Sequence, residues 1–153
     1  MLFAGFFRFW AGYSVGLLSG SFFEHRWPDQ ISNISITVTV TIIGGGLPAS
    51  IAGGYLSDRL EDQIPSIKGI IAGAGALMAT PFLFITFVIQ PGFWGSMFSY
   101  FIAFFVAEMW YGPSHAQINN MFPSEYQGFA MAVFNLFGAV AGAIATLILG
   151  KMQ

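Results

Sequence analysis

The sequence contains no cysteine and very little charge. The absence of cysteine excludes disulfide bonds, thiol catalysis and metal sites with thiolate ligands. Charged residues make up 8% of the 153 residues, whereas soluble domains carry about 25%. Because so few charges cannot coat a surface, water is not expected to be the solvent for most of the chain. The net charge of −2 gives no reason to expect nucleic-acid binding.

Asp, Glu, Lys and Arg are missing from three long stretches. These stretches cover residues 30–57, 69–107 and 126–150. About 20 apolar residues cross a bilayer as a helix, so the first and third stretches each fit one crossing. The second stretch fits one crossing and part of another. Barrel strands would need alternating polarity, and these runs are apolar on all sides. The sequence therefore predicts an all-α, multi-pass integral membrane protein, without indicating which membrane.

Five transmembrane helices are the expected architecture, in a single helical domain that covers residues 1–153. The polar and Pro-containing segments between the apolar runs set the boundaries. The helices are expected at about residues 2–23, 32–56, 67–89, 93–120 and 126–149.

Small residues recur at four-residue spacing in four of these helices. This spacing lets helix backbones approach closely, so that van der Waals contact replaces the missing hydrophobic driving force. Ala49 and Gly53 have this spacing in the second helix. The glycines expected to form helix-packing faces in the other helices are Gly12, Gly16, Gly20, Gly69, Gly73, Gly138 and Gly142.

Glu108 is the most informative single residue, because a carboxylate within an apolar helix is costly. If the fourth helix has its full expected length, Glu108 lies near the middle of that helix. Tyr111, His115 and Asn119 then follow on the same face at steps of three and four residues. This polar stripe would line a path for a solute or for protons. In the alternative, the helix ends near Pro113, Glu108 lies near the membrane interface and the rest of the stripe belongs to a loop.

Arg8 lies near the start of the first apolar stretch. From there its long side chain can reach the membrane surface. Alternatively, Arg8 is a buried cation that pairs with Glu108 or with an anionic solute.

Catalytic chemistry is not expected from this sequence. No nucleophile–base pair, metal-ligand cluster or phosphate-cradling loop is visible, and the two histidines are isolated in the sequence. We therefore expect no enzymatic activity, no catalytic residues, no metal and no cofactor.

Two segments resemble the major facilitator superfamily of secondary transporters. In the first, Gly54, Asp58 and Arg59 match the Gly-x-x-x-Asp-Arg signature that follows the second helix of each six-helix half. The second segment, residues 123–130, is similar to the Pro-x-x-x-Arg-Gly-x-Ala segment that opens the fifth helix of a half, with Gln127 in place of the usual arginine. Within the superfamily, these segments resemble the spinster-like and related eukaryotic branches.

The resemblance implies the seventh to eleventh helices of a twelve-helix fold, which binds its substrate between two halves near the bilayer midplane. The first and fourth helices would line the cavity, so that Arg8, Glu108 and Tyr111 face the solute. Asp58 and Arg59 would form a gating loop that closes the cytosolic side by pairing with a helix end.

Five helices are fewer than one half of such a transporter. The chain is therefore expected to be a fragment or half of a secondary active transporter that moves a small solute by alternating access, with Glu108 on a cavity-lining helix. The alternative is a transporter-derived subunit that does not transport and has a structural role in a larger membrane complex. The expected partners are the lipid bilayer, the remaining transporter half or other membrane subunits, and a small solute.

Overall fold

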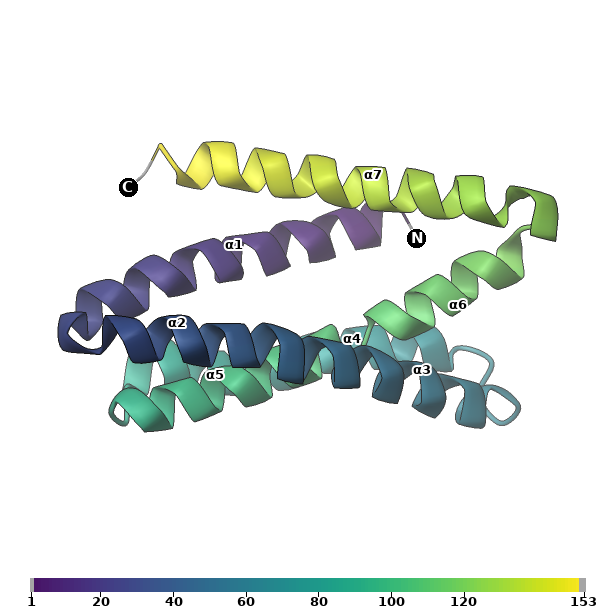
Figure 1. The fold of residues 1–153 in the computed structure, drawn as a ribbon. Helices are drawn as coiled ribbons and strands as arrows, with labels where there is room; N and C mark the ends of the chain where they lie inside the picture. The colour runs from purple at the N-terminus through teal and green to yellow at the C-terminus, as the bar shows by residue number, and fades with distance from the viewer. Residues whose placement is uncertain (1, 152–153) are drawn as a thin grey trace. The chain divides into compact units, whose positions relative to one another are not determined.

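The computed structural model describes residues 2–151, and these residues form five helical stretches joined by short loops, without a strand (Figure 1). The predicted all-α class is therefore confirmed. In chain order, the elements are α1 (Leu2–Arg26), η1 (Pro28–Gln30), α2 (Ile31–Val40), η2 (Thr41–Gly46), α3 (Leu47–Glu61), α4 (Ile67–Phe84), η3 (Ile85–Ile89), α5 (Phe93–Glu108), α6 (Tyr111–Met121) and α7 (Ser124–Leu149).

The second helical stretch consists of η1, α2, η2 and α3, which follow one another as one long continuous helix (Figure 1). We expected it to end near Leu56, before the charged residues, but it continues to Glu61. Pro48 lies within this helix, although proline cannot donate a hydrogen bond to the carbonyl four residues earlier. The six residues of η2 that precede it form a π-helical turn, and this wider turn accommodates the defect without ending the helix.

The third and fifth stretches keep close to their expected bounds. The third consists of α4 and the π-helical η3, and it ends where Gln90 adopts a left-handed backbone with φ 51°. Gly92, with φ 106°, completes the expected turn before α5, since glycine adopts positive φ without strain. The fifth stretch, α7, begins at Ser124, directly after Pro123.

Three helices of the described chain are long and apolar enough to cross a membrane: residues 28–61, 67–89 and 124–149, with 34, 23 and 26 residues. At 1.5 Å per residue they are about 51, 35 and 39 Å long, compared with about 30 Å for a hydrocarbon core. Large apolar side chains are exposed on them, among them Leu77 (76%) and Phe129 (72%). Such a surface is unusual for a monomer in water.

The chain divides into two compact units, one formed by residues 1–31 and 118–153 and the other by residues 32–117. In the first unit, α1 packs against α7. A Cβ atom added to Gly138 would lie 2.7 Å from the ring of Phe9, and one added to Gly142 would lie 2.7 Å from the ring of Tyr13. From the first contact to the second, the residue number rises by four in both helices, so α1 and α7 run parallel. The glycines provide the space for the two rings.

The other glycines expected to pack helices lie in open surroundings. A Cβ atom added to Gly12, Gly16, Gly20, Gly69 or Gly73 would have no atom of another segment of the described chain within 4 Å. Within the described chain these five glycines thus contact no neighbouring helix, and their role as packing faces stays a prediction. Four-residue spacing places glycines on one face, but only a neighbouring helix of matching shape makes that face an interface.

Candidate functional site

The fourth helical stretch is interrupted beside Glu108. The expected continuous helix over residues 93–120 is divided, because α5 ends at Glu108 and α6 begins at Tyr111. Met109 and Trp110 form the turn between them. The physical reason lies in Pro113, which has no N–H group to donate to the carbonyl oxygen of Met109 and whose ring would clash with that carbonyl in a continuous helix. Glu108 is therefore the last residue of a helix rather than a residue in the middle of one.

The interruption lies directly against the backbone of α3, within the unit of residues 32–117. A Cβ atom on Gly53 would overlap the carbonyl oxygen of Met109. A Cβ atom on Gly112 would overlap the carbonyl oxygen of Ser50 and would lie 3.0 Å from the amide nitrogen of Gly54. Any residue other than glycine at Gly53 or Gly112 would push these segments apart. Gly54 of the Gly-x-x-x-Asp-Arg segment thus lies at a contact between two backbones.

Polar and aromatic side chains flank the turn. Glu108, Tyr111 and His115 are half-buried. The rings of Tyr111 and His115 are 4.2 Å apart between their centroids, and the buried Trp110 contacts the Tyr111 ring edge-on at 5.8 Å. The structure therefore brings Tyr111 and His115 together beside the end of α5. A carboxylate, a phenol and an imidazole at such a turn can exchange protons or hydrogen-bond a polar solute.

Asn119, the last residue of the expected stripe, is exposed near the end of α6. Its carbonyl oxygen accepts a hydrogen bond of 2.8 Å from the side-chain amide of Gln127, which also donates to the carbonyl oxygen of Phe122 at 3.3 Å. Gln127 thus ties the end of α6 to the start of α7. This role was not foreseen from the sequence, where Gln127 was notable only for replacing an arginine.

Arg8 is half-buried on α1, in the unit that contains α7. Glu108 belongs to the other unit. The expected pairing of Arg8 with Glu108 or with an anionic solute therefore stays a prediction.

The residues of the expected gating loop lie at the end of α3. Asp58 and Arg59 are exposed, whereas Ser57 is buried and donates a hydrogen bond of 2.8 Å to the carbonyl oxygen of Gly54. The pairing of Asp58 and Arg59 with a helix end stays a prediction.

A different ion pair fixes the connection between α3 and α4. The ammonium group of Lys68 lies 2.7 and 2.8 Å from the two carboxylate oxygens of Glu61. Lys68 is 6% exposed and the side chain of Glu61 is 42% exposed. We did not foresee this pair, although opposite charges on either side of a short loop are a signal for it.

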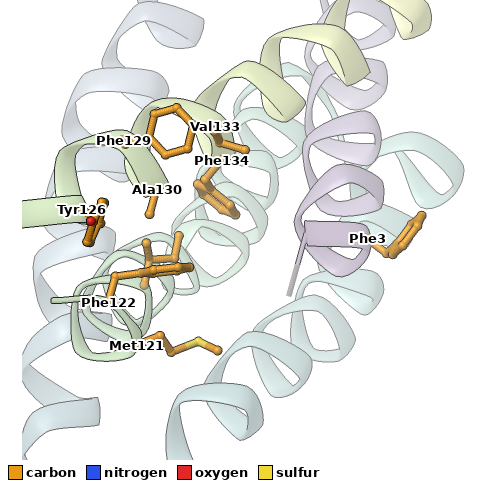
Figure 2. Close-up of a pocket in the computed structure, with 9 residues that line it drawn as sticks. Phe3, Met121, Phe122, Tyr126, Phe129, Ala130, Val133 and Phe134 are labelled. Carbon is orange, nitrogen blue, oxygen red and sulfur yellow. The ribbon is translucent and has the colours of Figure 1, made fainter.

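An apolar pocket of about 730 Å³ lies at the start of α7, within the unit formed by residues 1–31 and 118–153. Figure 2 shows the side chains around it, and the phenol group of Tyr126 is the only hydrogen-bonding side-chain group among them. The lining residues are Phe3, Ile118, Met121, Phe122, Tyr126, Phe129, Ala130, Val133 and Phe134. This pocket was not predicted from the sequence, in which the only signal for it is the recurrence of aromatic residues on one face of α7.

Residues suited to metal binding do not gather in the described part of the chain. No group of three or more His, Cys, Asp or Glu side chains lies close enough together there to hold a metal ion.

Comparison with known proteins identifies no relative: no family, no curated protein and no solved structure matches this chain.

Proposed function

We propose that the chain is a multi-pass integral membrane protein and forms part of a secondary active transporter of the major facilitator type. It moves a small solute by alternating access and carries out no enzymatic reaction. Support for the membrane setting comes from the three helices that are long and apolar enough to cross a bilayer and from the large exposed apolar side chains. The resemblance of the segments at Gly54 and at residues 123–130 supports the superfamily.

The observation that carries the proposal is the interruption of the fourth helical stretch between Glu108 and Tyr111. In a bilayer, backbone groups released from a helix must find partners within the protein or line a wet cavity. Secondary transporters place their binding sites at such discontinuous helices. A carboxylate at the end of α5 and the Tyr111–His115 ring pair on the next turn are suited to hold a polar part of a solute.

Each polar residue has a role in this proposal. Glu108 takes up and releases a proton as the cavity opens to either side, and Tyr111 and His115 hydrogen-bond the solute. Asp58 and Arg59 form the cytosolic gate, which the Glu61–Lys68 pair holds in place.

Proton flux into vesicles tests the proposal. The protein is reconstituted into vesicles with a trapped pH-sensitive dye, and a panel of small neutral and weakly charged solutes is added. We expect at least one solute to drive proton flux in the wild type. Glu108→Gln, which keeps the shape of the side chain but cannot ionise, abolishes this flux. Glu24→Gln is the matched control, because Glu24 is exposed at the end of α1, and its flux equals that of the wild type.

Two results would contradict the proposal. Solute-driven proton flux by Glu108→Gln at the wild-type rate would remove the role of Glu108. No flux with any solute, together with a stoichiometric place in a large complex on co-purification, would favour the structural subunit instead.

A further inference from the structure

The apolar pocket at the start of α7 has no part in the proposed transport. All the residues that line it belong to the unit of residues 1–31 and 118–153, whereas Glu108 and Tyr111 belong to the other unit. Its volume of about 730 Å³ falls within the range of about 300–1,000 Å³ that small-molecule sites have. The pocket is therefore a second candidate site, which would bind a ligand of its own.

Aromatic rings form most of the pocket wall. They are the rings of Phe3, Phe122, Tyr126, Phe129 and Phe134. Phe134 is 2% exposed and its ring centroid lies 5.5 Å from that of Phe9 on α1, so this part of the wall is fixed by packing. Phe129 is 72% exposed. The pocket thus combines a packed floor with a rim that a ligand can reach.

Water is a poor occupant of this pocket. A buried water needs two to four polar partners, and the phenol of Tyr126 is the only hydrogen-bonding side-chain group of the lining. The volume is also far larger than the voids that packed proteins leave empty. A ligand that fills the pocket must therefore be largely apolar.

The lining also limits the polar part of the ligand. Among the described residues, no charged side chain lines the pocket. A phosphate or a carboxylate that leaves water needs a cation or several hydrogen-bond donors, and a phenol supplies one donor. Tyr126 lies at one end of the lining and Phe3 at the other (Figure 2). A single uncharged polar group at Tyr126 would therefore leave the rest of the ligand against apolar side chains.

We propose that this pocket binds a rigid, polycyclic membrane alcohol of the sterol type. Its hydroxyl group bonds to the phenol of Tyr126, and its fused rings lie against Phe129 and Phe134. A rigid ligand loses less conformational entropy on binding than a flexible acyl chain does, so it can displace the lipid chains of a bilayer. This inference goes beyond the proposed function, because ligand binding is measured without solute or proton flux and the two can fail separately.

Equilibrium binding of radiolabelled cholesterol to the purified protein in detergent micelles tests the proposal. We expect saturable binding that unlabelled cholesterol displaces and that an excess of oleic acid or phosphatidylcholine does not. Ala130→Phe places a ring in the pocket and should weaken binding at least about tenfold. Tyr126→Phe removes only the hydroxyl group and should weaken binding about two- to tenfold, as expected for the loss of one neutral hydrogen bond.

Ala132→Phe and Tyr55→Phe are the matched controls. Both residues are exposed and neither lines the pocket, so both variants should bind cholesterol as the wild type does. Because Tyr126→Phe keeps the ring, an unchanged Tm of this variant separates a lost ligand contact from poor folding.

Three results would overturn the proposal. The first is the absence of saturable cholesterol binding by the wild type. The second is displacement by oleic acid or phosphatidylcholine as effective as that by cholesterol, which would mean that the pocket accepts any acyl chain. The third is wild-type affinity of Ala130→Phe or of Tyr126→Phe, which would place the ligand outside the pocket or its hydroxyl group away from Tyr126.

Discussion

The carbonyl oxygen of Met109 lies against the α-carbon of Gly53, so closely that a Cβ atom at Gly53 would overlap it. This contact joins the interrupted helix to α3 through the two backbones, without intervening side chains. In a second such contact the glycine comes from α6 and the carbonyl from α3, because a Cβ atom at Gly112 would overlap the carbonyl oxygen of Ser50. These backbone contacts hold the turn beside Glu108 against α3. The positions of Glu108 and Tyr111 therefore depend on the packing of this turn against α3.

Gly53→Ala should destabilise the protein severely. The new methyl group meets a backbone carbonyl, which cannot rotate away as a side chain can, so α3 and the turn must separate. We expect a loss of about 3 kcal/mol or more, measured as a lower midpoint of thermal unfolding by circular dichroism. Gly73→Ala is the control, because Gly73 lies in open surroundings, and it should be neutral or stabilising by up to about 1 kcal/mol. Equal effects of the two substitutions would disprove the backbone contact.

Gly138→Ala should be coupled to Phe9, because the new Cβ atom would lie 2.7 Å from the Phe9 ring. The single substitution is expected to cost about 1–3 kcal/mol through overpacking. Phe9→Ala removes the ring. The double variant should therefore lose about 1 kcal/mol less stability than the two single variants lose in sum. Gly16→Ala, in open surroundings, should show no such coupling. Strict additivity in a double-mutant cycle would mean that α1 and α7 do not meet at this point.

Glu61→Gln should destabilise the protein more than removal of the whole ion pair. It leaves the ammonium of Lys68, which is 6% exposed, without its carboxylate. Because Glu61 is partly exposed, solvent screening limits the expected loss to about 1–3 kcal/mol. The double variant Glu61→Gln/Lys68→Met should recover most of this loss. Arg59→Gln is the control at an exposed charge and should stay within about 0.5 kcal/mol of the wild type. An ion pair without structural importance would make Glu61→Gln indistinguishable from Arg59→Gln.

The helices could be predicted from the sequence because their apolar runs end at charged or proline-containing segments. The third stretch was predicted with the bounds that the structure has, residues 67–89. The predicted end of the second stretch came too early, because charged residues at an exposed helix end do not interrupt the hydrogen bonds of the helix. Pro48 and Pro81 lie inside helices, whereas Pro113 follows a break. Their sequence positions alone do not distinguish these outcomes.

The candidate site could be predicted only in part. Glu108, Tyr111 and His115 were recognised as polar residues at helical spacing, and the ring contact of Tyr111 with His115 agrees with this. The break packs against Gly53 and Gly54 of α3, which are far away in the sequence. Likewise, Gly16 and Gly138 belong to the same four-residue pattern, yet only Gly138 meets a ring. Close packing requires matching surfaces on two helices. The glycine pattern of one helix does not reveal whether another helix packs against it.

Reactivity of single cysteines tests the central claim, that Glu108 lies on a water-filled path through a membrane-spanning chain. The protein contains no cysteine, so each introduced thiol is the only one present. Glu108→Cys and Tyr111→Cys place the thiol at the interrupted helix. Phe98→Cys is the decisive control, because Phe98 lies on α5 and is 67% exposed but should face lipid.

The measurement is the labelling rate of each variant in vesicles, with a hydrophilic, membrane-impermeant thiol reagent on both sides of the bilayer. We predict rapid labelling of Glu108→Cys and Tyr111→Cys and little labelling of Phe98→Cys, although Phe98 is the more exposed position. Labelling of Phe98→Cys at the rate of Glu108→Cys, or no labelling of either Glu108→Cys or Tyr111→Cys, would contradict the account.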